Sequence, residues 1–190
     1  DKADAKMIAR YAAMHHQELR VSTFPSRVII KLQALLAYRD RLIKTKKSFK
    51  VACGELSGFV DKQICSPIEK ETKSLLKVME KKIKKVDRQI EELLSEHPDI
   101  YKNYQLAKSV KGVGPMIAAH MIVYTQNFTT ITESRKFAAF SGIAPFASSS
   151  GSSLQKRPSV SHLANKKMKS LLNNGAWSAA RFDNEIRKYF

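Results

Sequence analysis

The chain has 190 residues, a length that suggests one domain of ordinary size or two small ones. Hydrophobic residues make up 43% of it, which is enough for a folded core and excludes wholesale disorder. The chain has 34 Lys and Arg against 17 Asp and Glu, so its formal net charge is +17. Such an excess favours a polyanionic partner, because each neutralised phosphate releases counterions. Nucleic acid is the first candidate, an anionic membrane surface the second, and a merely basic surface the third.

Three absences narrow the class of protein. No stretch approaches 18 consecutive apolar residues, so we expect no membrane-spanning helix. The first residues, Asp1 and Lys2, do not open a secretory signal. Cys53 and Cys65 lack the spacing of a zinc site and are too few for a disulfide scaffold. These features predict a cytoplasmic protein with reduced thiols.

Apolar residues recur at helical spacing along most of the chain, which predicts an all-α fold. The expected helices cover residues 3–19, 27–44, 67–97, 100–109, 115–125, 133–140, 160–180 and 183–189. Within the third and longest of these helices, a heptad seam follows Leu76, Met79, Ile83, Val86, Ile90 and Leu93. The seam requires a partner helix, either residues 28–43 of the same chain or the same helix of a second copy. The predicted architecture is a long coiled-coil-like helix followed by a compact helical domain.

The segment Val110-Lys111-Gly112-Val113-Gly114-Pro115 joins two expected helices and resembles a helix-hairpin-helix motif. Glycines permit a tight turn and close approach to another backbone, and proline suits the first position of the next helix. The free amides there, with Lys108 and Lys111, would bind a DNA phosphate. The alternative is a turn whose glycines serve packing alone.

A serine-rich loop is expected over residues 148–153, where five serines surround Gly151. By composition alone the loop is a flexible linker. A serine hydroxyl is a weak nucleophile unless a base or cation activates it. Lys156, Arg157, Lys166 and Lys167 supply cations nearby, which stabilise charge in phosphoryl transfer.

The order of these segments carries a resemblance to a known family. The Gly-Val-Gly segment, residues 137–145 (FAAFSGIAP), Ser149-Ser150-Gly151 and residues 160–172 follow one another. Together they resemble the transposase domain of the DEDD-type bacterial insertion-sequence transposases, a group that includes the pilin-gene invertases. Asp1-Lys2-Ala3-Asp4-Ala5 resembles the last segment of that family's RuvC-like nuclease domain. Two departures are Ala164, where the family often has Gly, and Ser152-Ser153, where it often has Gly and Lys.

The resemblance implies three parts: the end of a RuvC-like domain at 1–22, a helical connector at 23–98 and a helical transposase domain at 99–190. It assigns the nucleophile to Ser150, with Ser149 as the second choice. It assigns Asp1 and Asp4 to a four-carboxylate Mg²⁺ site, which is incomplete in this chain, so we expect the chain to be inactive alone. The expected DNA contacts are Lys108, Lys111, Gly112, Gly114, Lys156, Arg157, Lys166 and Lys167.

The resemblance also implies partners. They are DNA, a guide RNA as in some family members, and a second copy bound through the Leu76 to Leu93 helix, with no membrane. The function implied is a DNA transposase or recombinase of a mobile insertion sequence that acts through a serine nucleophile and metal-bound carboxylates. The alternative is a non-catalytic DNA- or RNA-binding helical module that dimerises through that helix.

Overall fold

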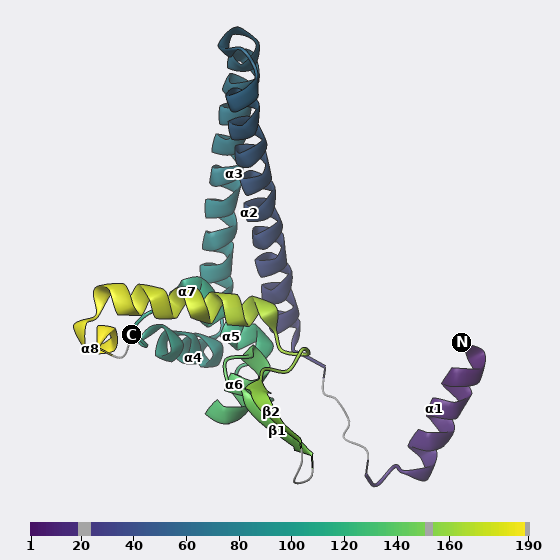
Figure 1. Cartoon of the computed structure of the whole chain (residues 1–190). Coiled ribbons are helices and arrows are strands. Elements are labelled where there is room, and N and C mark those ends of the chain that lie inside the picture. Colours follow the sequence, from purple (N-terminus) through teal and green to yellow (C-terminus); the bar gives the residue numbers. More distant parts are fainter. Residues whose placement is uncertain (19–23, 151–153, 189–190) are drawn as a thin grey trace.

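The computed structural model describes residues 1–18, 24–150 and 154–188, with the backbone alone for residues 146–150 and 154–157 (Figure 1). The all-α expectation is confirmed, since a two-stranded hairpin is the one departure from helix among the described elements. The elements are α1 (Lys2–Met14), α2 (Arg27–Phe59), α3 (Lys62–Ser95), α4 (Pro98–Lys108), α5 (Pro115–Tyr124), α6 (Ser134–Ser141), β1 (Phe146–Ser150), β2 (Leu154–Ser159), α7 (Lys166–Phe182) and α8 (Asn184–Arg187). No described helix is both long and apolar enough to cross a bilayer.

Helices α2 and α3 form a long antiparallel hairpin that projects from the rest of the molecule (Figure 1). The heptad seam of α3 closes on α2 of the same chain. Val86, Ile90 and Leu93 are buried in one cluster with Ile29 and Leu32. The sequence left two partners open for the seam, a helix of the same chain or a second copy. In the structure the partner is α2 of the same chain.

Both helices of this hairpin are longer than expected. The sequence predicted that α2 ends near residue 44 and that α3 starts at Pro67, and both bounds were wrong. Helix α3 begins at Lys62, so Pro67 lies inside it. Proline lacks an N–H, so the helix loses one backbone hydrogen bond at this position. Packing between the helices offsets that loss, with Cys65 buried two residues earlier.

One hydrophobic core joins the base of the hairpin to the compact domain. Ile90 and Leu94 of α3 belong to the same buried cluster as Tyr104 of α4 and Ile122 of α5. The Tyr104 hydroxyl donates a hydrogen bond to Glu91 at 3.0 Å, and burial is the main cause that raises the pKa of this phenol. The predicted boundary between residues 98 and 99 thus lies within a continuous core, which fixes the position of α4 and α5 relative to the hairpin.

Helix α7 lies across the compact domain and packs against α5 and α6 (Figure 1). Its buried face carries Met168, Gly175 and Ala179. The helix begins at Lys166 rather than at residue 160 as predicted. Asn165 is the cap, because its side-chain oxygen accepts the Met168 N–H at 2.8 Å, and asparagine is among the preferred N-cap residues.

The serine segment is not wholly a loop, which corrects the sequence-based expectation. Strands β1 and β2 pair antiparallel, with Ser148 opposite Lys156 and Ser150 opposite Leu154. The register shifts between Phe146 and Ser148. Backbone pairing of this kind does not need apolar side chains, so the serine composition gave no signal for it. The rest of the expected loop, residues 151–153, lies outside the described residues.

Candidate nucleic-acid interface and serine hairpin

The α4–α5 turn rests on α7 through two glycines. Gly112 has a φ of +86°, and a Cβ built there would lie 2.4 Å from the Gly175 carbonyl oxygen. In return, a Cβ on Gly175 would lie 2.7 Å from the Gly112 oxygen. Gly112 is therefore required both by its left-handed backbone and by the close approach of the two backbones. For this glycine the structure supports the packing explanation.

Gly114 differs from Gly112 in its surroundings. It is the N-cap of α5, its φ is −80°, and no atom lies within 4 Å of a Cβ built on it. Neither its backbone nor its contacts within the chain require glycine. It lines a groove of about 650 Å³ between the turn and α7, which Lys108 and Asn174 also line. An uncrowded helix start that faces a groove can receive an anion.

The two lysines of this turn are used differently. Lys111 forms an ion pair with Asp183, which also accepts backbone N–H groups of Glu185 and Ile186 and so caps α8. The hydrogen bond between the two side chains raises the pKa of Lys111 and lowers that of Asp183. The Lys108 ammonium lies 5.0 Å from the centroid of the Tyr104 ring. Both lysines line the groove, but Lys111 is paired there with Asp183, whereas the described residues include no ion-pair partner for Lys108.

At the N-terminal end of α7, too, one lysine is paired with an aspartate and the neighbouring lysines are exposed. The Lys167 ammonium contacts both carboxylate oxygens of Asp40 in α2, at 2.8 and 2.7 Å. Asp40 also lies 3.9 Å from the ring of the buried His120, whose other nitrogen is 2.7 Å from the Met116 carbonyl oxygen. Burial is the main cause that lowers the pKa of His120. Lys167 therefore ties α7 to the coiled-coil hairpin and does not face solvent as an unpaired cation.

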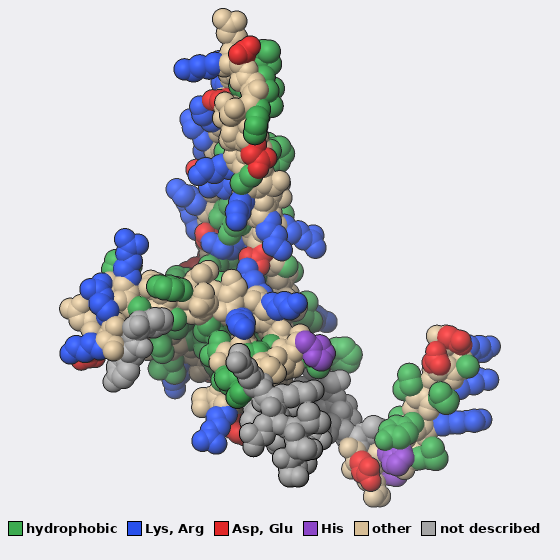
Figure 2. All heavy atoms as spheres, in the orientation of Figure 1, with side chains coloured by type: hydrophobic (Ala, Val, Ile, Leu, Met, Phe, Trp, Pro, Cys, Tyr) green, Lys and Arg blue, Asp and Glu red, His purple; other side chains and the backbone are tan. Residues whose placement is uncertain are grey.

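Lys166 and Lys169 lie on the exposed side of the same helix end. Both line a groove of about 670 Å³ together with Asn173 and Ile143. Ile143 immediately precedes the segment that leads into β1, so this basic groove adjoins the base of the serine hairpin. Figure 2 shows Lys and Arg side chains over α7 and along the α2–α3 hairpin.

The base of the serine hairpin is held by backbone contacts. The Asn165 N–H donates to the Phe140 carbonyl oxygen at 2.7 Å, which joins the end of α6 to the start of α7. Gly142 ends α6 with a φ of +68°, and a Cβ there would lie 2.7 Å from the Ala164 Cβ. These contacts fix where β1 leaves α6 and where β2 returns to α7.

The predicted nucleophiles are placed by backbone alone. Ser149 pairs with Gln155, and Ser150, the last residue of β1, pairs with Leu154. Ser150 thus lies at the far end of the hairpin from Phe146. The side chains of Ser149, Ser150, Lys156 and Arg157 lie outside the described part of the structure, so their catalytic and DNA-binding roles stay predictions.

Asp1 and Asp4 are not brought near the serine hairpin. They lie at the start of α1, which contacts no other element among the described residues and stands apart in Figure 1. Asp1 caps the helix through the Ala3 N–H at 2.8 Å, and Asp4 lies 3.8 Å from the terminal ammonium. Carboxylates are suitable Mg²⁺ ligands, but two are too few, and no group of three potential ligands occurs in the described residues. These donors fit a magnesium site in kind but not in number.

Sequence reasoning missed the acids that neutralise two of the predicted lysines. Asp40 is 127 residues from Lys167 in the chain, and Asp183 follows the last residue of α7. No spacing rule links such distant residues. The one available signal was Asp183-Asn184-Glu185, whose aspartate before a short helix is typical of an N-cap.

Comparisons with known proteins show what the chain is similar to. Residues 104–190, from α4 to the end of the chain, match the family described as Transposase IS116/IS110/IS902. The pilin gene-inverting proteins of Moraxella lacunata and Moraxella bovis are each 25% identical to the chain over 176 residues. The match covers 90% of this chain and 50% of each relative, so the chain spans about half the length of the curated relatives it matches. Over residues 104–190 the chain is therefore similar to transposases of the IS116/IS110/IS902 family.

Proposed function

We propose that the chain is part of a transposase that cuts and rejoins DNA strands of a mobile insertion sequence through a serine in the β1–β2 hairpin. The observation that carries the proposal is the basic groove of Lys166 and Lys169 at the base of that hairpin. The five residues of β1 span roughly 16 Å, so a duplex held on α7 would extend as far as the end of β1. The family match over residues 104–190 supports the same assignment.

In the proposed reaction the Ser150 hydroxyl oxygen forms a bond to a DNA phosphorus atom. The bond from phosphorus to a sugar oxygen breaks, the serine proton passes to a general base, and the sugar oxygen takes a proton from a general acid and leaves as a hydroxyl. Rejoining is the reverse step, with a sugar hydroxyl attacking the phosphoserine. Ser149 is the second choice for the nucleophile. Lys156 and Arg157 on β2 would stabilise the charge that develops on the phosphate.

The proposed DNA contacts fall into two classes. Lys108 and Lys166 lie at grooves and would bind phosphates directly, with the Gly114 end of α5 as a further anion site. Lys111 and Lys167 are paired with aspartates and would act by holding α8 and α7 in place.

A bound Mg²⁺ would supply Lewis-acid stabilisation to this chemistry. Asp1 and Asp4 would contribute two of its oxygen ligands, and the others would come from outside the described residues. The proposed partners beyond DNA are a guide RNA and a second copy of the chain. Because α2 covers the heptad seam, a second copy would bind the outer face of α3, where Val78 is 50% exposed.

One observation favours the alternative, a non-catalytic nucleic-acid-binding module. The carboxylates of α1 lie apart from the serine hairpin, so this chain by itself does not assemble both halves of a catalytic site. In that case the basic grooves would bind nucleic acid with no covalent step.

Covalent adducts distinguish the two functions. The chain would be extended to the full length of its curated relatives and incubated with element-end DNA and Mg²⁺. We expect a denaturant-resistant protein–DNA adduct that Ser150→Ala abolishes while DNA binding persists, with Ser153→Ala as the matched control. If Ser150→Ala and Ser149→Ala both form normal adducts, the serine mechanism is wrong. The 190-residue chain alone should bind DNA without forming adducts.

A further inference from the structure

The far end of the α2–α3 hairpin has almost no buried core of its own. At the base of the hairpin, Leu36 and Val86 belong to the buried cluster. Between these two residues along the chain, a stretch that the structure describes in full, Cys65 is the one buried residue. The two helices still run side by side there, so each covers the other on one side only (Figure 1). Apolar side chains in this part of the hairpin therefore stay in contact with solvent.

A row of exposed apolar side chains follows α3 beside its heptad seam. Spacings of three and four carry the seam back from Leu76 through Thr72 and Glu69 to Cys65, so two of these positions are polar. One position earlier in each case, the same spacing is followed by exposed apolar residues, namely Ile64, Ile68, Leu75 and Val78. The sequence of α3 thus contains a second apolar seam, on its outer face and near the tip of the hairpin.

The second seam borders a groove. Ile68 and Leu75 line this groove of about 560 Å³, and α2 contributes Phe49 to it. Glu71 is the one charged residue of the lining. Ile64, Ile68, Leu75 and Val78 together with Phe49 form the tip patch. A largely apolar groove on a pair of helices suits the apolar face of another helix.

The tip of the hairpin is neutral, in contrast to the chain as a whole. Residues 49–75 contain four lysines and four acidic residues, so their formal net charge is zero, whereas the chain carries +17. Lys73 and Glu69 form an ion pair at 3.3 Å. A neutral surface does not attract nucleic acid, whose binding depends on an excess of cations. It does allow two identical surfaces to meet without repulsion.

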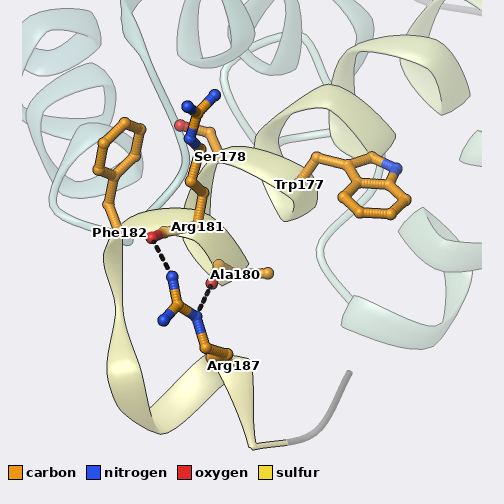
Figure 3. Close-up of a pocket in the computed structure, with 6 residues that line it drawn as sticks. All are labelled: Trp177, Ser178, Ala180, Arg181, Phe182 and Arg187. Carbon is orange, nitrogen blue, oxygen red and sulfur yellow. Dashed lines mark hydrogen bonds between the residues drawn. The ribbon is translucent and has the colours of Figure 1, made fainter.

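The pocket at the C-terminal end of α7 shows why this charge matters. Phe182 is exposed there, but Arg181 and Arg187 also line the pocket (Figure 3). The Arg187 side chain donates hydrogen bonds to the Ala180 and Arg181 carbonyl oxygens at 3.3 and 2.9 Å, which fixes its guanidinium in place. Two copies that met through this pocket would bring their arginines together. The tip patch has no such excess of positive charge.

We propose that the tip patch binds the tip patch of a second copy of the chain. Two hairpins would then pack together near their tips as a four-helix bundle, with Ile68 and Leu75 of each copy in the contact. The contact is isologous, because both copies use the same residues. This inference rests on the second copy named in the proposed function and identifies the surface that it binds. The basic grooves of the compact domain stay free for DNA.

The test is sedimentation of the 190-residue chain in the absence of DNA. We expect a reversible equilibrium between monomer and dimer. Ile68→Lys and Leu75→Lys should each raise the dissociation constant of the dimer at least about tenfold, because a charge replaces an apolar contact at the centre of the interface. Ile30→Lys is the matched control and should leave the constant unchanged. Ile30 is 50% exposed at the base of α2, against 48% for Ile68 at the tip.

Salt distinguishes this apolar contact from one driven by charge. Raising the salt concentration should leave the dimer intact, whereas duplex DNA binding by the same protein should weaken steeply. The sedimentation measurement contains neither DNA nor Mg²⁺. A failure of the proposed serine chemistry would therefore leave its result unchanged, and a monomeric chain would leave the serine chemistry open to its own test.

Two results would overturn the proposal. The first is a chain that sediments as a monomer at every concentration. The second is a dimer that the lysine variants at positions 68, 75 and 30 affect equally, which would place the contact elsewhere. Circular dichroism and a urea titration of each variant establish that the hairpin is folded. If a lysine variant unfolds, the milder Ile68→Ser tests the same contact and should still raise the dissociation constant.

Discussion

The two ends of α7 are held in place by different kinds of contact. The N-terminal end is held by polar groups, namely the Lys167–Asp40 ion pair and the Asn165 N–H bond to Phe140. The C-terminal half is held by close backbone packing between Gly175 and Gly112. Polar contacts of this kind tolerate changes of a few tenths of an ångström, but glycine-to-glycine packing does not. The helix is thus rigidly located at one end and electrostatically tied at the other.

The comparison also separates the roles of the predicted DNA-binding lysines. At each of the two grooves one lysine at or near the groove is paired with an aspartate, and a neighbouring lysine lines the groove without such a pair among the described residues. Lys167 and Lys111 are the paired ones, and Lys166 and Lys108 lie at the grooves. A basic run in the sequence is therefore not a uniform DNA-binding surface. Some of its charge is used to assemble the domain.

The largest effect is expected at the packed end. Gly112→Val should lower the free energy of unfolding by about 4 kcal/mol, because it places a branched side chain at a positive φ and against the Gly175 carbonyl. Urea denaturation measures the change. Gly114→Ala is the control in the same turn and should change stability by no more than about 0.5 kcal/mol, since its Cβ meets open space. Equal losses in the two variants would show that the two backbones do not touch.

A smaller effect is expected at the polar end. Asp40→Ala should cost about 2 kcal/mol of unfolding free energy, because it removes a charge-assisted hydrogen bond that is partly shielded from solvent. It should also strengthen DNA binding, since Lys167 then becomes available to a phosphate. A double-mutant cycle with Lys167→Met measures the coupling between the two side chains. A coupling free energy of zero would mean that the Lys167–Asp40 ion pair does not stabilise the fold.

The third prediction concerns pH and the buried His120 beside Asp40. Burial lowers the pKa of its imidazole below 6.5, so the folded chain binds a proton less readily than the unfolded chain. The stability that follows is fully present above pH 6.5 and is lost as the pH falls towards the folded-state pKa. Urea midpoints between pH 7.5 and 5.5 should therefore fall less in His120→Gln than in the wild type. If the urea midpoints of the two proteins fall equally with pH, His120 is not buried as a neutral imidazole.

The smallest effect is expected for the ion pair between Lys111, whose side chain is exposed, and Asp183, whose side chain is mostly covered. Lys111 lowers the pKa of Asp183, so the stability contributed by this carboxylate is present above its ordinary pKa near 3.8 and is lost as the pH falls through the folded-state value. Asp183→Asn keeps the cap on α8 but removes the charge. Its unfolding midpoint should decline less than that of the wild type between pH 5 and pH 3. An identical decline would mean that the ion pair does not persist in solution.

Helical periodicity predicted most of the fold, because the apolar stripes of α3, α4 and α5 are buried stripes in the structure. Periodicity did not predict the segments whose secondary structure depends on tertiary contacts. Residues 45–59 lack a clear stripe, yet they continue α2 because α3 runs alongside them. The serine hairpin had no strand composition, since its pairing relies on backbone hydrogen bonds.

The candidate site was predictable in its residue types but not in its pairings. The Gly-Val-Gly turn and the basic start of α7 both lie at grooves, and the DNA contacts that the sequence assigns to them stay predictions. The partners of Lys111 and Lys167 come from elements that are distant in sequence or begin beyond the motif. The Ser150, Mg²⁺ and guide RNA assignments stay predictions.

The most direct test of the account is the salt dependence of duplex DNA binding by the 190-residue chain. Each phosphate contact contributes about 0.9 to the slope of log affinity against log salt. We predict that Lys166→Ala combined with Lys169→Ala lowers this slope by about 2. Lys81→Ala combined with Lys82→Ala, a charge-matched control on α3, should leave the slope nearly unchanged. Equal losses in both pairs would mean that the chain binds DNA through its net charge alone and would contradict a DNA site beside the serine hairpin.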